Sequence, residues 1–167
     1  MNKEQALLIL EKYSPMPNEE CMTEEMLNEY AESIDYFSEH PDTVCIKPIM
    51  MTFSLSESYG IHDHAVAVLE SFSNDQVVPQ LIEIIQSENE GKRYWGTQIA
   101  KSFPDERLVD SLSSCINDPN EEIRAYSIYA LHCIGNKKIL PLLQERLAIE
   151  EDEEVLEELN EAISSFT

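Results

Sequence analysis

The sequence repeats an apolar pattern with a period of 31 residues over its second two thirds. Leucine recurs at Leu81, Leu112 and Leu143, and Phe72 is followed in the same phase by Phe103. Six positions are apolar in all three copies, although hydrophobic residues make up only 43% of the chain. A fixed period of roughly 20 to 50 residues is the signature of stacked supersecondary units, so this repeat constrains the fold more than any local motif.

Each repeating unit has the spacing of two short helices. Apolar residues step by three and four positions along 123–134, Gly135-Asn136 supplies a C-cap and a turn, and Leu140, Leu143 and Leu147 form a second apolar face. The pattern predicts helices at about 3–13, 23–38, 42–56, 61–73, 75–87, 91–103, 105–117, 120–134, 137–149 and 152–165.

The period divides the chain into two parts. Residues 61–167 carry the repeats and end in a capping helix, whose Glu157, Glu158 and Glu161 supply the polar outer surface that a terminal repeat needs. Residues 1–60 match the period poorly. We therefore expect an N-terminal helical cap of degenerate repeats over 1–60, followed by regular repeats over 61–167.

The most regular copy resembles a HEAT-like repeat. That family's pattern runs Asp-Pro, apolar-Arg, Ala-Leu, apolar-Gly-Asp and apolar-Pro-x-Leu. The matching residues are Asp118-Pro119, Ile123-Arg124, Ala130-Leu131, Ile134-Gly135-Asn136 and Leu140-Pro141-Leu142-Leu143. The resemblance covers roughly 60–165. Arg93 takes the arginine position one copy earlier, and His62 stands there in the copy before that.

The resemblance implies an all-α fold, a HEAT-like α-solenoid of antiparallel helix pairs. It also implies that a partner binds the concave face, which the second helix of each pair forms. It implies no chemistry, because short bacterial solenoids of this kind include subunits that handle phycobilins, alkylpurine DNA glycosylases and presumed toxin-neutralising immunity proteins.

The repeat register predicts which side chains face outward from the second helices. These candidate partner-binding residues are Gln76, Gln80, Glu83, Arg107, Asp110, Ser111, Ser114, Lys138, Gln144 and Glu145. Three aromatic residues, Tyr94, Trp95 and Tyr126, are candidate interface anchors, because aromatic residues are favoured at binding hot spots. Packing between repeats is the competing interpretation of Trp95 and Tyr126, which lie one period apart.

The charge of the chain indicates the class of partner. Asp and Glu outnumber Lys and Arg by 33 to 11, which gives a formal net charge of −22. Residues 1–42 hold eleven acids and two bases. Such a protein repels nucleic acid and acidic membranes and attracts cationic surfaces. We expect a protein partner of basic character, such as a toxin blocked by an immunity protein.

Catalytic and metal-binding patterns are weak. His62 and His64 are two residues apart, so on a helix they point away from each other and make a poor metal site. His132 and Cys133 are adjacent and form a poor nucleophilic dyad. We expect no enzyme activity, cofactor or metal.

Two alternatives remain open. One is an enzyme, either a HEAT-like DNA-repair glycosylase or another solenoid enzyme, that uses Arg93, Tyr94 and Trp95 around Asp110 or Asp118. The other is a chromophore lyase or a chaperone-like helper.

The N-terminal sequence and the cysteines favour a cytoplasmic location. Glu4 and Glu11 flank the short apolar stretch at the N-terminus, and no small-residue cleavage site follows, so we expect no signal peptide. The four cysteines form no C-x-x-C pair and are expected to be reduced. No apolar run approaches the roughly 20 residues of a membrane span.

Overall fold

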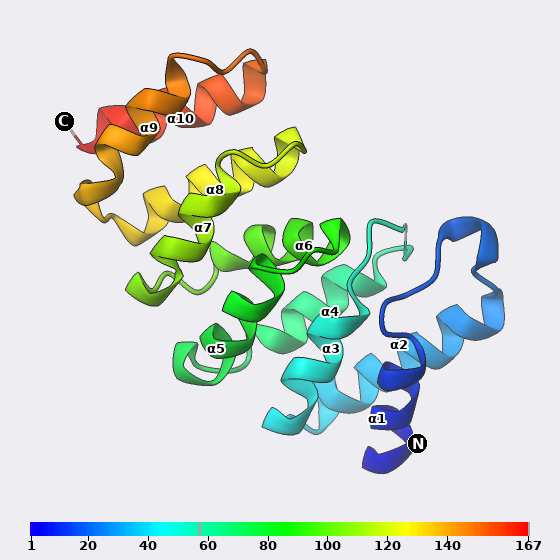
Figure 1. The fold of residues 1–167 in the computed structure, drawn as a ribbon. Helices are drawn as coiled ribbons and strands as arrows, with labels where there is room; N and C mark the ends of the chain where they lie inside the picture. The colour runs from blue at the N-terminus through cyan, green and yellow to red at the C-terminus, as the bar shows by residue number, and fades with distance from the viewer. Residues whose placement is uncertain (57, 167) are drawn as a thin grey trace. The chain divides into compact units, whose positions relative to one another are not determined.

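The computed structural model describes residues 1–56 and 58–166, and every regular element within them is a helix (Figure 1). The α-helices are α1 (Lys3–Lys12), α2 (Glu24–Glu39), α3 (Ile46–Thr52), α4 (Ile61–Leu69), α5 (Asn74–Ile85), α6 (Glu90–Ala100), α7 (Val109–Cys115), α8 (Glu121–Ile134), α9 (Leu140–Leu147) and α10 (Glu153–Phe166). The predicted fold class, all-α with HEAT-like helix pairs, is confirmed. Each predicted helix has a counterpart, and no helix end lies more than four residues from its predicted position.

The chain divides into two compact units, Met1–Trp95 and Gly96–Thr167, and the boundary falls inside α6. In the first unit α3 packs against both α1 and α5, and α2 packs against α4. In the second unit α8 packs against α7 and α10, and α9 packs against α10. Packing between alternate helices is the arrangement of stacked helix pairs. The predicted boundary after residue 60 stays a prediction, and Thr167 lies outside the described residues.

The repeat positions form the core of both units. Leu81, Leu112 and Leu143 are completely buried, and Leu69 and Leu131 are buried at the matching position of the preceding helices. Burying a leucine side chain contributes roughly 1.5–3 kcal/mol. The apolar period read from the sequence is therefore the pattern that holds the helices together.

Three of the helices begin in the same way. The side chains of Asp42, Asp105 and Asn136 each accept a hydrogen bond from the backbone N–H two residues later, at 3.1, 2.9 and 3.0 Å. A single 3-10 turn follows each cap and leads into α3, α7 or α9. Residues 1–60 thus share a helix start with the regular repeats, although their apolar pattern is out of register.

Gly91 allows the first turn of α6 to lie directly on the backbone of residues 54 and 55. A Cβ atom at Gly91 would lie 2.6 Å from the Ser54 Cα atom and 2.7 Å from the Leu55 nitrogen. Both neighbours are backbone atoms, so no side-chain rotation can relieve the contact.

We therefore predict that Gly91→Ala lowers the free energy of unfolding by about 1–3 kcal/mol, because overpacking outweighs the roughly 1 kcal/mol that alanine gains in a helix. Chemical denaturation measures the change, with the exposed substitution Glu88→Ala as the control. A Gly91→Ala protein as stable as the wild type would contradict the close approach.

Candidate functional site

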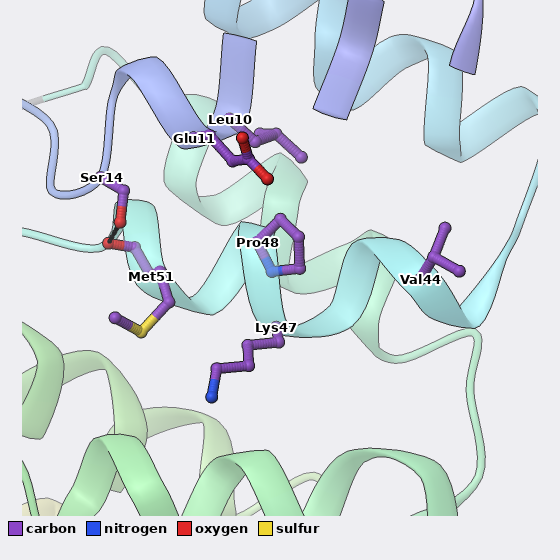
Figure 2. Close-up of a pocket in the computed structure, with 7 residues that line it drawn as sticks. All are labelled: Leu10, Glu11, Ser14, Val44, Lys47, Pro48 and Met51. Atoms are coloured by element: carbon purple, nitrogen blue, oxygen red, sulfur yellow. Dashed lines mark hydrogen bonds between the residues drawn. The ribbon is translucent and has the colours of Figure 1, made fainter. Parts of the chain in front are cut away.

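An open groove lies between α1 and α3 in the first unit (Figure 2). Its volume is about 530 Å³. The lining residues are Leu10, Glu11, Ser14, Val44, Lys47, Pro48 and Met51. Apolar side chains predominate among them, and Val44 is 48% exposed, so the groove offers apolar surface to a partner. Exposed apolar surface bordered by polar residues is typical of a protein interaction site.

Hydrogen bonds fix the two walls of the groove. The Ser14 hydroxyl donates to the Met51 carbonyl at 3.1 Å and ties the end of α1 to α3 (Figure 2). The Lys47 ammonium extends away from the groove toward α5, where it bonds both carboxylate oxygens of Glu83 at 2.9 and 2.8 Å. The positive charge of Lys47 is thereby balanced, and Glu11 remains as the acidic residue of the lining.

The predicted outward residues on α5 serve different local roles. Gln76 closes a helix cap, because its Oε1 atom accepts hydrogen bonds from the amide and the hydroxyl of Ser73, both at 3.0 Å. The Oε1 atom of Gln80 is buried and has no partner among the described residues. Glu83 is the predicted residue that the structure brings next to the groove, through Lys47.

The predicted residues of the second unit are mostly exposed, with one clear correction. Ser111 is only 2% exposed, so the expectation that it faces outward is wrong. It lies beside Leu112 on the face of α7 that is buried. The other six, Arg107, Asp110, Ser114, Lys138, Gln144 and Glu145, are exposed. Arg107 is held by the Asp105 carboxylate at 2.7 Å.

Trp95 packs within the first unit. Its indole N–H donates to the Ser54 carbonyl at 2.9 Å, and its ring stacks on Phe53 with 5.3 Å between centroids. Tyr94 meets the Trp95 ring edge to face. Tyr126, the third aromatic candidate, lines a small pocket between α8 and α10. Packing therefore describes Trp95 better than the role of an exposed anchor.

The two arginines of the repeat make identical contacts one period apart. The Nη1 group of Arg93 donates to the carbonyls of Ser87 and Glu88 at 3.0 and 2.9 Å. Arg124 donates in the same way to the carbonyls of residues 118 and 119, at 3.0 and 3.1 Å. The arginine position of the repeat thus fixes the loop before its own helix.

Arg124 also pairs with a carboxylate from the loop between α9 and α10. Glu150 accepts from the Arg124 guanidinium at 3.0 and 2.9 Å and from Arg146 at 2.8 and 2.6 Å. Its side chain is only 2% exposed. Burial alone would raise the pKa of Glu150, but hydrogen bonds from Arg124, the Asp152 amide and Arg146 outweigh it and lower that pKa to about 2.

His62 occupies the arginine position of the first copy and is completely buried. The Thr52 hydroxyl donates to the Ile49 carbonyl at 2.7 Å, so it accepts from Tyr30 at 2.8 Å, and Tyr30 accepts from His62 Nδ1 at 2.9 Å. This chain assigns the proton to Nδ1. The Nε2 atom has no partner among the described residues. Burial lowers the pKa of His62 to about 4, so the imidazole is neutral.

Metal ligands do not gather in the described part of the chain. His64 is exposed and faces Asp35 at 3.4 Å, whereas His62 is buried. No group of three or more His, Cys, Asp or Glu side chains in residues 1–56 and 58–166 is placed to hold an ion.

Sequence reasoning missed the groove, because its residues fall in the segment that does not follow the period. The shared helix start was the available signal. Asp42 precedes Pro48 at the start of α3. Asn136 precedes Pro141 in a similar way at the start of α9, which is the second helix of the last regular repeat. That similarity places 42–52 as a second helix, and therefore on the predicted binding face.

Comparison with known proteins identifies the fold family. A family model described as HEAT repeats matches residues 78–164, which is just over half of the sequence. The chain belongs to the HEAT-repeat family. A search of curated proteins found no match.

Two solved structures are similar to this HEAT-repeat protein. Human deoxyhypusine hydroxylase in complex with glycerol has a TM-score of 0.59 and 16% sequence identity, over 98% of this chain and 63% of that one. This chain therefore spans less than two thirds of the enzyme's length. An engineered protein has a TM-score of 0.56 and 16% identity, over 96% of this chain and 78% of its own. At this identity the likeness shows the fold alone.

We predict that Glu150→Gln lowers the free energy of unfolding by about 3 kcal/mol at pH 7, because it removes a buried charge that two arginines require. The folded pKa lies below the ordinary value of 4.5, so this contribution is complete above pH 4.5 and is lost as the pH falls through 2. Denaturation curves of the variant and wild type should converge over that window. The exposed neighbour Glu151→Gln is the control, and a constant difference down to pH 2 would refute the ion-pair account.

His62 affects the stability of the fold in a different pH range from Glu150. Its folded pKa of about 4 lies below the ordinary 6.5, so the unfolded chain takes up the proton first and stability falls as the pH drops from 6.5 to 4. Relative to His62→Gln, which cannot titrate, the wild type should lose about 3 kcal/mol over this range. His40→Gln, at an exposed site, should retain the wild-type profile. Parallel profiles for wild type and His62→Gln would show that His62 is not buried in its neutral form.

Proposed function

We propose that this HEAT-repeat protein is a non-catalytic interaction module that docks a basic protein partner. Support comes from a repeat scaffold that carries an apolar groove within its acidic N-terminal segment. The net charge is −22, and residues 1–42 alone contribute −9. A field of this sign draws cationic surfaces and speeds encounter by roughly ten- to a thousandfold at low salt.

The groove between α1 and α3 supplies the short-range contact in this proposal. Its exposed apolar residue Val44 offers area to bury, and Glu11 gives the lining a negative charge that Lys47 does not offset, because Lys47 is bonded to Glu83. A partner segment that combines an apolar side chain with nearby lysines or arginines fits both features. In this proposal the net charge attracts the partner at long range, and the groove recognises it on contact.

The proposal places the protein in the cytoplasm, where free thiols persist. None of the four cysteines forms a disulfide in the described structure, and Cys21 and Cys133 are exposed. No described helix is long and apolar enough to cross a membrane. An immunity protein that neutralises a basic toxin is the specific form of this function that we favour.

A matched pair of substitutions tests the docking surface. Val44→Lys places a positive charge in the groove, and Ile149→Lys makes the same change at a residue of the second unit that is 67% exposed. We predict that the wild type and Ile149→Lys bind a basic protein from native extract at low salt, whereas Val44→Lys loses at least tenfold in affinity for that same purified protein, because an apolar contact becomes a repelling charge.

Titration of the purified partner at increasing salt concentration measures how much of the binding affinity is electrostatic. Affinity should fall steadily with salt, since exposed charges are screened over about 10 Å at 0.1 M. The docking proposal fails if no basic protein binds or if Val44→Lys binds as tightly as Ile149→Lys.

A further inference from the structure

A small pocket in the second unit has an aromatic wall and an acidic wall. It lies between α8 and α10 and has a volume of about 200 Å³. Tyr126 and Tyr129 come from one helix, and Glu154 and Glu158 come from the other. Residues three or four positions apart share a helix face, so each pair lines the pocket together. Ala125 and Lys101 complete the lining.

One carboxylate oxygen of the acidic wall lacks a hydrogen-bond donor. The Oε2 atom of Glu158 is buried and has no hydrogen-bond partner among the described residues. Burial raises the pKa of this carboxyl, and the negative charge of Glu161 raises it further. A buried acceptor without a partner destabilises the fold, and a cationic donor removes that cost.

The aromatic wall favours the same ligand. Tyr129 is 39% exposed, so its ring remains accessible beside the carboxylates. The face of an aromatic ring attracts a cation, and aromatic rings line sites that recognise ammonium ligands. The pKa of Tyr129 is raised first by Cys133 and by burial, then by the negative charges of Glu158 and Glu161.

The size of the pocket limits the ligand to one side chain. Its volume of about 200 Å³ is several times the 30 Å³ of one water and below the 300–1,000 Å³ of sites for drug-sized molecules. Lys101 contributes one positive charge to the lining, whereas Glu154 and Glu158 contribute two carboxylates. The two carboxylates therefore leave the lining net negative.

We propose that this pocket between α8 and α10 binds the cationic end of a lysine or arginine side chain from the basic partner. The inference rests on the proposed function for the origin of that side chain. The pocket holds the charged group between the two tyrosine rings and the Glu158 carboxylate. It thereby adds a second recognition point on the unit that does not contain the groove.

A small probe tests the pocket without a partner protein. N-acetyl-lysine methylamide is titrated into ¹⁵N-labelled protein, and the neutral N-acetyl-norleucine methylamide is titrated in parallel. We expect saturable shifts at the amides of Ala125, Tyr126 and Tyr129 with the lysine probe and none with norleucine. Absence of saturable shifts, or an equal response to norleucine, overturns the inference.

Two variants localise the binding. Glu158→Gln should weaken the lysine probe at least fivefold, while Glu145→Gln, an exposed residue of α9 with the same loss of charge, should stay within twofold. If Glu158→Gln folds poorly, Tyr129→Leu serves as the second test variant, because it removes an exposed aromatic ring from the pocket and should also weaken the lysine probe. Equal weakening by Glu145→Gln would show a general charge effect and refute the site. Probe binding does not depend on the groove, so failure here leaves the docking proposal intact, and failure of docking leaves the pocket intact.

Discussion

The structure depends on burying the apolar face of each helix against its neighbours. The second helices α7 and α9 span only seven and eight residues, and isolated helices of fewer than about 12 residues are not stable in water. Their stability must therefore come from neighbours placed at a fixed repeat. Leu81, Leu112 and Leu143 meet this requirement, because they are buried at the same position of three successive repeats. The arginines at 93 and 124 fix the loops between helices, so the register of the apolar faces is maintained.

Charge acts on this scaffold in two ways. Most acidic side chains are exposed and repel one another, which opposes the compact state at a net charge of −22. Glu150 differs, because its side chain is buried and its carboxylate is shared by Arg124 and Arg146. The exposed acids supply attraction for a cationic partner, whereas the buried one fixes the loop between α9 and α10. Attraction of a cationic partner and internal ion pairing are thus carried by different acidic residues.

Sequence periodicity predicted the helices well, because apolar spacing directly encodes which face is buried. It predicted the site less well, because outward position alone does not decide whether a side chain is available. Ser111 lies at the edge of the buried face, and Gln76 is used by a helix cap, and neither outcome can be read from a 31-residue register. The groove between α1 and α3 was missed because residues 1–60 retain the capping pattern of the repeat but not its apolar period. The pairing of Tyr126 and Tyr129 with the acids of α10 needed the packing of α8 on α10.

The central claim is that a basic protein is docked through the acidic first unit, and hydrogen–deuterium exchange of the complex tests it most directly. The free protein and its complex with the purified partner are compared amide by amide. The account predicts slower exchange at the end of α1 and across 43–51, where the groove is formed. A stable complex in which both segments exchange at the rate of the free protein would contradict it.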